Sequence, residues 1–442
     1  MTEKIYDYII IGSGIAGLYY GYKLKTYYPN CKFLILERYK KKYIGGRCGN
    51  YKFYGVDVVT GAGVGRLAKD KLLMDLIKKL KITYNIRDVK PYYSENIKRI
   101  NIINELKNLR SSYKKFCESI SHNGINKENR EKLEISKIPK LTFRQFASSK
   151  LGTIYYKNFI TNAGYSDYEN EDVYETLYYY GMEDNACCWK SVHLLWNQLI
   201  SALVNVIGIQ NIKFSQNVIS LSSFNNNNNN NLIIVNCEYK HADEVKILDY
   251  YTKKVIVATN INSLRKLFPQ HSIYNEIECQ PFLRLYAKFS LKSVPLLHKY
   301  IKGYTFVTGP LQKIIPIDIE RGIIMIAYND NKNSIAVKPY IENNEFNRHF
   351  FTELFCKTFS LHKYETNDEI FKLKIISLKS FYWSCGTHYY KPLNTKNYNS
   401  REQFIYLAQH PEPNINVIGE VVSRNQGWVE GALESVVNVW KK

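Results

Sequence analysis

A glycine-rich turn between an apolar strand and a helix is the feature that most constrains how this chain folds. Residues 5–37 show the order strand, glycine turn, helix, strand, and the turn carries Gly12, Gly14 and Gly17 in the pattern GxGxxG. In such a unit the first glycine makes the tight turn, the second lets a pyrophosphate approach the main chain, and the third lets the helix pack closely on the strand. The pattern predicts a βαβ unit of the Rossmann type that binds a dinucleotide.

Glu37 strengthens this prediction. It stands at the end of the second strand, about 20 residues after the glycine turn, where the acid of such units accepts hydrogen bonds from ribose hydroxyls. An acid rather than an arginine at this place disfavours a 2′-phosphate on the ribose. It does not by itself distinguish NAD from FAD.

The rest of the chain indicates that this unit is one part of a larger fold. With 442 residues the chain is long enough for two domains. Helix-period segments fill much of residues 69–209, including the stretch SVHLLWNQLISALVNVIG. Strands return at 217–239 and 250–260, β-rich runs follow between 280 and 385, and a last strand precedes a helix near Gly427.

We therefore predict an α/β fold with a Rossmann-type dinucleotide-binding domain assembled from discontinuous segments and an inserted α+β substrate domain. The first domain comprises residues 1–75, 206–265 and 386–442. The inserted domain has a helical part, residues 76–205, and a β-rich part, residues 266–385. The asparagine run from Asn225 to Asn231 is interpreted as a hairpin loop.

The chain is strongly basic, with a formal net charge of +21 and a pI near 9.3. Such a charge favours contact with nucleic acids, anionic membranes or acidic partners. Lysine is nevertheless spread along most of the chain together with abundant Tyr, Ile and Asn, which is the usage of an AT-rich coding sequence. We expect no specific nucleic-acid motif and, because no apolar run approaches roughly 20 residues, no membrane span.

The nine cysteines include no CxxC pair, and no secretory signal is evident. This usage predicts reduced thiols. The expected location is the cytoplasm or another reducing intracellular compartment, or a virion if the source is viral. The adjacent Cys187 and Cys188 are read either as a redox element or as buried free cysteines.

Further glycine motifs stand near both ends of the chain. They are IGGR at 44–47, GAGVGR at 61–66, GE at 419–420 and GWVEGA at 427–432. Together with the first glycine turn, these residues resemble the flavin-dependent amine oxidase family, which contains monoamine oxidases, polyamine oxidases and related histone demethylases. The resemblance covers residues 5–66, 217–265, 281–290 and 383–437.

The resemblance implies that the cofactor is FAD and that the Rossmann-type domain is an FAD-binding domain. Cys385 stands one or two positions too early to match the cysteine that some family members link to the flavin, so we expect FAD to be non-covalent. The residues that the resemblance places along the cofactor are Gly12, Ser13, Gly14, Ala16, Gly17, Glu37, Arg38, Gly46, Arg47, Gly61, Ala62, Val218, Gly419, Glu420 and Val429.

The activity implied by the resemblance is oxidation of an amine. A hydride passes from the carbon that bears nitrogen to flavin N5, and oxygen reoxidises the flavin to give hydrogen peroxide. The partners would be a small-molecule amine and oxygen, while the oligomeric state stays open, a dimer included. Two alternatives keep the fold: an enzyme like the isoprenoid desaturases and protoporphyrinogen oxidases, or a non-catalytic FAD-binding structural or interaction protein.

The resemblance also suggests which side chains face the substrate. Trp428 matches one wall of the family's aromatic cage, and His388 or Tyr389 is expected to supply the other. Where the family has a lysine near flavin N5, this chain aligns Arg284, with Lys288 on the same strand face as an alternative.

Three further residues have open roles. Glu183 and Asp184 either anchor a second amino group of the substrate or flank a helix. His193 is expected to be a packing or solvent-facing helix residue.

Overall fold

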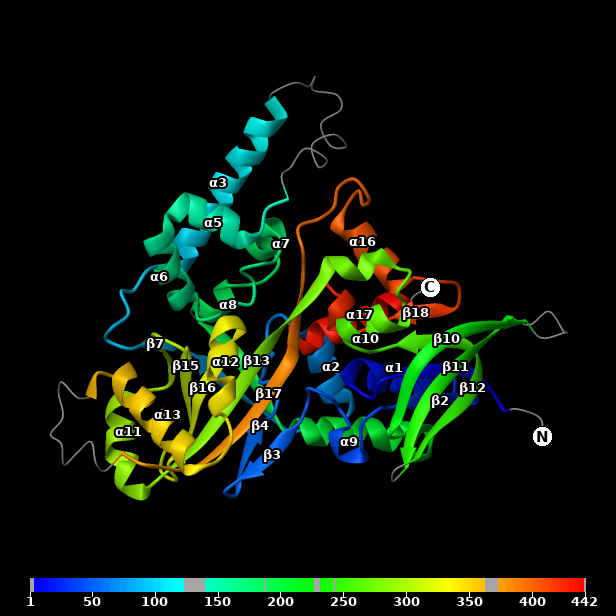
Figure 1. Cartoon of the computed structure of the whole chain (residues 1–442), viewed down its shortest axis with the longest axis horizontal. Coiled ribbons are helices and arrows are strands. Elements are labelled where there is room, and N and C mark those ends of the chain that lie inside the picture. Colours follow the sequence, from blue (N-terminus) through cyan, green and yellow to red (C-terminus); the bar gives the residue numbers. More distant parts are fainter. Residues whose placement is uncertain are drawn as a thin grey trace.

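The computed structural model describes residues 4–122, 140–186, 188–225, 231–241, 244–361 and 373–440. Its first layer is a parallel sheet (Figure 1). Strand order and register place the first strand of the chain in the centre, with its successors on both sides, as in a Rossmann fold. The parallel strands, in spatial order, are β9 (Ile212–Lys213), β2 (Phe33–Leu36), β1 (Ile5–Ile11), β12 (Glu244–Val257) and β18 (Ile415–Val417).

Helices cover both faces of this sheet because its strands are apolar on both sides. Ile10, Ile35 and Ile256 pack on one face against three helices, whereas the intervening residues of the same strands pack on the other face. The helices of the first face are α1 (Ile15–Tyr27), α9 (Trp196–Ile207) and α17 (Val429–Trp440), and those of the second are α10 (Ile261–Leu267) and α16 (Arg401–Gln409).

An antiparallel hairpin extends the sheet at one edge. Strands β10 (Gln216–Asn225) and β11 (Asn231–His241) pair with each other, and β11 pairs with β12. This confirms the predicted hairpin, although residues 226–230 lie outside the described part of the chain.

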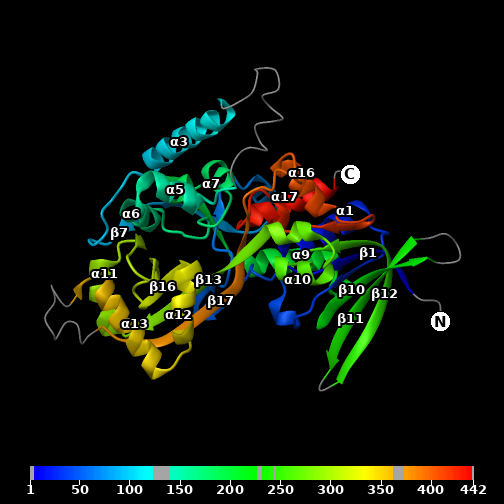
Figure 2. The same ribbon diagram turned by 45° about the horizontal axis from the view of Figure 1, so that its top comes forward.

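The second unit of the fold is built on a six-stranded, mostly antiparallel sheet that lies beside the Rossmann unit (Figure 2). Its helices, α11 (Val294–Tyr300), α12 (Asn331–Val337) and α13 (Glu345–Thr358), pack on one face. Its strands, in spatial order, are β17 (Ile375–Tyr390), β13 (Ile277–Phe289), β16 (Ile323–Asp330), β15 (Lys313–Asp318), β14 (Tyr304–Phe306) and β7 (Pro91–Tyr93).

The long strands β13 and β17 connect the two units. Ile277 and Cys385 belong to the hydrophobic core of the Rossmann sheet, whereas Leu283 and Leu378 belong to the core of the second sheet. Figure 1 shows both strands running from one unit to the other. Residues far apart in the sequence therefore meet along this pair.

A helical cluster with its own core lies above the second sheet in Figure 1. It contains α3 (Ile102–His122), α5 (Phe143–Leu151), α6 (Thr153–Ala163), α7 (Val173–Tyr178) and α8 (Glu183–Ala186). The remaining elements are the hairpin β3 (Asn50–Phe53) and β4 (Val56–Val59), α2 (Lys71–Lys79), and a small sheet of β5 (Gly65–Arg66), β8 (Trp189–Leu194) and β6 (Tyr84–Val89).

One predicted helix is partly wrong. The stretch around His193 forms strand β8, and the helix begins only at Trp196. The cause is long-range pairing, because β8 is hydrogen-bonded to β6 and β5. His193 is accordingly a strand residue.

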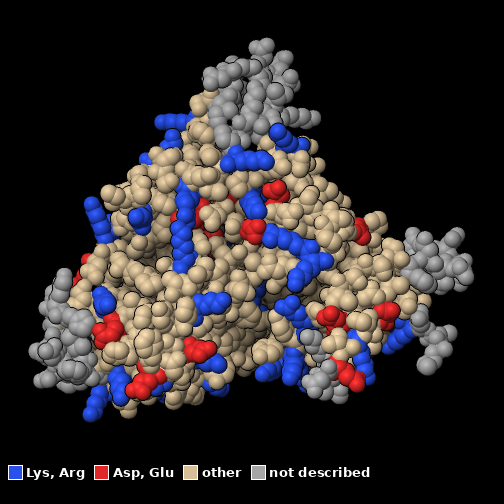
Figure 3. Space-filling view, in the orientation of Figure 1, with Lys and Arg blue, Asp and Glu red and all other residues tan. Residues whose placement is uncertain are grey.

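Two surface properties bear on the sequence-based expectations. No helix in the described part of the chain is long and apolar enough to cross a membrane. On the face seen in Figure 3, lysine and arginine side chains are spread over the whole surface rather than gathered in one patch. This distribution agrees with a compositional origin of the charge.

Candidate functional site

A large cavity begins at the glycine turn and extends between the two sheets. Its volume is about 1750 Å³, whereas a site for one drug-sized ligand has roughly 300–1,000 Å³. One end is lined by Gly12, Gly14 and Glu37, and the other by Phe282, Tyr328 and Trp428. The cavity therefore has room for a dinucleotide and a second, smaller molecule.

The glycine turn is packed so tightly that two of its glycines have no room for a side chain. Gly12 has φ +106°, and a Cβ there would lie 2.5 Å from the carbonyl oxygen of Ala258. A Cβ on Gly17 would lie 2.1 Å from the oxygen of Gly12. A Cβ on Gly14 would meet nothing within 4 Å, because Gly14 faces the cavity at the start of α1. This arrangement suits a pyrophosphate at a helix N-terminus.

Glu37 is held in a fixed position at the end of β2. Its carboxylate accepts hydrogen bonds from the amide and the hydroxyl of Ser13, both at 2.8 Å, and from the amide of Tyr39 at 2.9 Å. Arg38 stacks on the Tyr39 ring at 4.6 Å. Glu37, Arg38 and Val218 all line the cavity, whereas Ser13 and Gly17 are not among the residues of its wall.

The middle of the cavity contains a buried carboxylate with several partners. The guanidinium of Arg47 donates hydrogen bonds of 2.6 Å to Glu420 and to the carbonyl of Gly386, and the amide of Gly427 donates to Glu420 at 3.0 Å. His388 Nδ1 is hydrogen-bonded to the same carboxylate. Burial opposes ionisation, but His388 and Arg47 hold the pKa of Glu420 well below its usual value. Glu420 is therefore an anion on the cavity wall.

The loop at Gly61 and Ala62 is fixed by side chains of the second sheet. Arg284 Nε donates to the carbonyl of Gly61 at 2.8 Å, and the indole of Trp383 donates to the carbonyl of Thr60 at 2.7 Å. The backbone amide of Ala62 donates a hydrogen bond of 2.7 Å to the backbone carbonyl of Arg47. The β-rich unit thus positions main chain that belongs to the dinucleotide end.

Of the two candidate cations on β13, only Arg284 lies on the cavity wall. It is buried and stacks on Tyr328 at 4.0 Å. Lys288 lies outside the cavity, and its ammonium group donates to the carbonyl of Arg321. The sequence reasoning missed Lys313, which is fully buried and whose Nζ lies 2.8 Å from the ring centre of Tyr165. Burial holds the pKa of Lys313 well below its usual value.

The far end of the cavity is aromatic. Trp428 lies on its wall, and the guanidinium of Arg66 stacks on the Trp428 ring at 3.9 Å. His388 and Tyr389 are not among the described residues that line this cavity. The aromatic residues that do line it are Tyr165, Tyr180, Trp189, Phe282, Tyr286, Tyr304, Tyr328, Tyr382 and Trp383.

Asp167 is the acidic residue at this aromatic end, and the sequence reasoning did not single it out. It is buried, lines the cavity, and accepts hydrogen bonds from the hydroxyl of Tyr180 and, at 3.4 Å, from that of Thr387. Burial, with the nearby charge of Asp330, raises the pKa of Asp167 to about 7. No local pattern marks this residue: Tyr180 stands 13 residues further along the chain, and Thr387 comes from the distant strand β17.

The acids suggested as substrate anchors are already paired. Asp184 forms ion pairs with Lys69 at 2.8 Å and Arg66 at 3.3 Å, and Glu183 is paired with Arg110. Their charges are therefore used within the protein.

His193 does line the cavity, from strand β8. Its Nε2 lies 2.8 Å from the hydroxyl of Ser191. Burial lowers the pKa of His193 to about 4, so the imidazole is neutral at pH 7.

The expectation that the cysteines are reduced thiols is wrong in part. Cys279 and Cys385 form a disulfide, and Cys188 is also disulfide-bonded. Cys279 and Cys385 are 106 residues apart in sequence, but they come together, with Cα atoms 5.2 Å apart, because β13 and β17 are neighbouring strands. Cys187, the other member of the adjacent pair Cys187 and Cys188, lies outside the described residues. Among the described residues, the cysteines that form no disulfide are Cys31, Cys48, Cys117, Cys237 and Cys356.

Comparison with known proteins agrees with this architecture. Residues 10–80 match the family described as NAD(P)-binding Rossmann-like domain. The structure superposes on putrescine oxidase, in its wild-type form bound to putrescine, with a TM-score of 0.70 and 12% identity over 100% of both chains. It superposes on cyclohexylamine oxidase from Brevibacterium oxydans with a TM-score of 0.64 and 13% identity, over 99% of this chain and 100% of that chain.

A sequence relative covers a small part of the chain. An uncharacterized protein of Acanthamoeba polyphaga mimivirus is 35% identical over 78 residues, which are 17% of this chain and 15% of that protein. The structural likeness establishes the fold. The chain has the fold of these amine oxidases over its full length, as the glycine motifs predicted.

Proposed function

We propose that this protein binds FAD non-covalently and oxidises an amine at its C–N bond, with oxygen as the final electron acceptor and hydrogen peroxide as a product. The observation that carries the proposal is the single cavity that joins a Rossmann glycine turn to an aromatic chamber containing a buried carboxylate. A dinucleotide at the first end and a cationic molecule at the second would fill it.

The residues at the dinucleotide end fit FAD. Gly14 leaves the main chain open to a pyrophosphate, Glu37 is oriented for a ribose, and the start of α17 at Val429 reaches the cavity. We assign residues 1–75, 206–265 and 386–442 to the FAD-binding domain, and 76–205 and 266–385 to the substrate domain. The residues on the cavity wall that would hold FAD are Gly12, Gly14, Ala16, Glu37, Arg38, Gly46, Arg47, Gly61, Ala62, Val218, Gly419, Glu420 and Val429.

Bound FAD supplies the hydride acceptor, and the side chains of this protein select and orient the amine. The aromatic rings that line the chamber present electron-rich faces to a cationic or neutral nitrogen. Asp167 pairs with an ammonium group once its carboxyl is ionised. A substrate with two amino groups would place one at Asp167 and leave the other free to react.

Arg284 acts as a positioning residue in this proposal. Its hydrogen bond to Gly61 fixes the loop that would carry the flavin ring, and its charge stays on the cavity wall at any working pH. Lys288 has no such role, because its ammonium group points to Arg321.

The polarity of the chamber favours an amine over an isoprenoid or a porphyrin precursor. A buried carboxylate facing an apolar substrate would lose its hydration without a compensating charge, which costs several kcal/mol. An ammonium group removes that cost. Asp167 therefore supports an amine oxidase over a desaturase-like enzyme. Its place on the cavity wall supports an enzyme over a structural flavoprotein.

The test is anaerobic reduction of the purified flavoprotein by single amines, followed by admission of air. Putrescine, which is bound by the structurally similar putrescine oxidase, and a monoamine of the same length form a matched pair. We expect putrescine to bleach the flavin absorbance at roughly 450 nm faster than the monoamine, and air to restore it with peroxide. A flavin that no amine reduces would overturn the proposal.

A further inference from the structure

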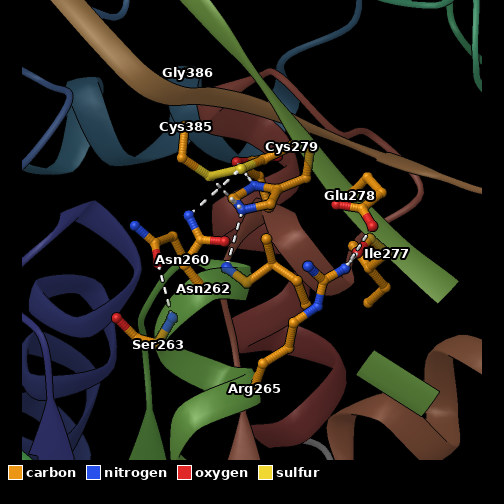
Figure 4. The surroundings of a disulfide bond; sticks show 12 residues. Asn260, Asn262, Ser263, Arg265, Ile277, Glu278, Cys279, Cys385 and Gly386 are labelled. Carbon is orange, nitrogen blue, oxygen red and sulfur yellow. Dashed lines mark hydrogen bonds and ion pairs between the residues drawn. A yellow bond between two sulfur atoms is a disulfide. The ribbon is translucent and has the colours of Figure 1, made fainter. Parts of the chain in front are cut away.

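The disulfide between Cys279 and Cys385 lies where β13 and β17 leave the Rossmann unit, beside the start of α10 (Figure 4). Its place is unusual for a purely structural link, because Ser384, Cys385 and Gly386 also form part of the cavity wall. The two strands are already joined by backbone pairing on both sides of the bond. The cross-link is therefore not needed to bring them together.

The two sulfur atoms differ in environment. Cys385 is buried in the core of the Rossmann unit, whereas Cys279 is only partly buried. The side-chain amide nitrogen (Nδ2) of Asn262, an exposed residue on α10, lies 3.9 Å from Cys279 Sγ. Cys279 is the more exposed of the two residues, so a thiol that arrives from the bulk solvent rather than through the cavity would meet Cys279 first and displace Cys385.

His388 is placed to assist that displacement. Its side chain is fully buried, and its Nε2 lies 3.3 Å from Cys385 Sγ. The same nitrogen accepts a hydrogen bond of 3.2 Å from the amide of Ile261, so it carries the lone pair and Nδ1 carries the proton. Nδ1 donates to the carboxylate of Glu420, so the imidazole ring is held between Glu420 and Cys385. A proton taken up at Nε2 would stand beside Cys385 Sγ, and a neighbouring positive charge stabilises a thiolate.

From this asymmetry we propose that Cys279–Cys385 is a thiol–disulfide exchange site for small thiols, with Cys279 as the attacked sulfur, Cys385 as the leaving group and His388 as the proton acceptor. This function goes beyond amine oxidation and does not depend on it. The site takes a compound of the thiol or dithiol class and returns its disulfide.

The exchange is balanced in two steps. A thiol loses its proton and attacks Cys279 Sγ; the bond between Cys279 and Cys385 breaks, and its electron pair remains on Cys385 as a thiolate. The proton is held at His388 Nε2 beside that thiolate. A second thiol attacks the mixed disulfide on Cys279, releasing the oxidised compound and leaving two protein thiols. A low-molecular-weight disulfide reverses both steps and restores the bond.

The first test measures access to the bond in the folded holoprotein. The protein is treated with millimolar dithiothreitol, alkylated and analysed by mass spectrometry, peptide by peptide. We expect Cys279 and Cys385 to become labelled well below the unfolding temperature, and oxidised glutathione to restore the bond. In the Cys385→Ser variant, oxidised glutathione should form a stable mixed disulfide on Cys279. A bond that resists reduction until the protein unfolds would overturn the proposal.

The second test measures the thiolate at Cys385 directly. In the Cys279→Ser variant, the rate of alkylation of Cys385 by iodoacetamide is followed against pH. We expect half of the maximal rate below about pH 7, compared with about 8.5 for an ordinary thiol, and a return towards the ordinary profile in Cys279→Ser, His388→Gln. Cys356 in the same sample is the internal control, because burial raises its pKa to about 11. An ordinary profile for Cys385 in the single variant would overturn the role of His388.

Both readouts count modified cysteines and need no amine. Failure of amine oxidation would leave them unaffected, and failure of the exchange would leave the proposed amine oxidation untouched. The two proposals are thus tested separately.

Discussion

The dinucleotide end of the cavity is made largely of main chain, whereas the aromatic end is made of side chains. Gly12, Gly14 and Gly61 present backbone to the first end, and the nearest carboxylate there, Glu37, is fixed by the turn itself. At the other end Asp167 and Tyr328 come from different units and are oriented by neighbours such as Tyr180 and Arg284. At the first end, Gly12 and Gly61 have no room for a side chain, while the second end can be changed one side chain at a time.

The largest effect is expected at the glycine turn. Gly17→Ala places a methyl group 2.1 Å from the carbonyl oxygen of Gly12, and such overpacking against backbone costs ~3 kcal/mol or more. Gly14→Ala adds its methyl group to open space. We expect Gly17→Ala to lower the thermal midpoint of the apoprotein strongly, and Gly14→Ala to leave that midpoint unchanged but to weaken FAD binding by ~100-fold, because the pyrophosphate must approach the backbone. Calorimetry of the apoproteins and FAD titration check both.

One outcome for the variants Gly17→Ala and Gly14→Ala would contradict this prediction. If Gly14→Ala bound FAD as tightly as the unchanged protein, the cofactor would not approach this turn. The assignment of the glycine turn as the dinucleotide end of the cavity would then be wrong.

The next effect concerns the carboxylate of the aromatic end. Asp167→Asn keeps the size of the side chain and removes its charge, and loss of one partner from a buried charge pair costs ~2 kcal/mol or more. We expect kcat/KM for a diamine to fall ~30-fold, with FAD content unchanged and with little effect on a monoamine. Steady-state oxygen uptake measures this. Equal losses for both amines would show that Asp167 has a general structural role instead.

These two positions illustrate what could be predicted from the sequence. The glycine turn, Glu37 and the Rossmann fold follow from contiguous residues, since each interaction there spans one βαβ unit. Asp167 was missed because no motif links it to Tyr180, which stands between α7 and α8, and because Thr387 on β17 is brought to it only in the folded chain. A local sequence pattern therefore predicts the dinucleotide end of the cavity but not the residues of its aromatic end.

The same reason explains the errors around β17 and β8. His388 was expected in the substrate chamber, but it turns towards Glu420 and Cys385 instead. The disulfide and strand β8 both depend on strand pairing between distant segments, which no spacing rule reveals. Trp428 lies on the cavity wall directly before α17, an element of the Rossmann unit, and its role as one wall of an aromatic cage stays a prediction.

The pH dependence sharpens the role of Asp167. Its pKa of about 7 is above the ordinary value, so the carboxyl is neutral below this pH and charged above it. The ionised fraction rises from about one tenth at pH 6 to about nine tenths at pH 8. We expect the affinity for a non-reacting dicationic diamine analogue to rise nearly tenfold over this range, measured by its effect on the flavin spectrum.

The Asp167→Asn variant is the control for that titration, since it has no carboxyl to ionise. Its affinity should stay flat between these pH values. A rise of the same size in the variant would assign the pH dependence to another group, for which His193, with a pKa of about 4, is too acidic.

The smallest expected effect lies on β13, where the two ends of the cavity are connected. Arg284 is a side chain of the substrate unit, yet its Nε donates to Gly61 of the dinucleotide end. Arg284→Lys keeps a positive charge but loses the planar donor group, so the loop at Gly61 should be held less firmly. We expect FAD affinity to fall ~5-fold, which corresponds to about 1 kcal/mol, and the matched change Lys288→Met, on the same strand but outside the cavity, to alter it less than about 2-fold. FAD titration by fluorescence measures both.

If Lys288→Met had the larger effect, the hydrogen bond from Arg284 to Gly61 would not be the link between the two ends of the cavity. If only Arg284→Lys weakened FAD binding, the dinucleotide end, although made of main chain, would depend on a side chain that the substrate unit provides.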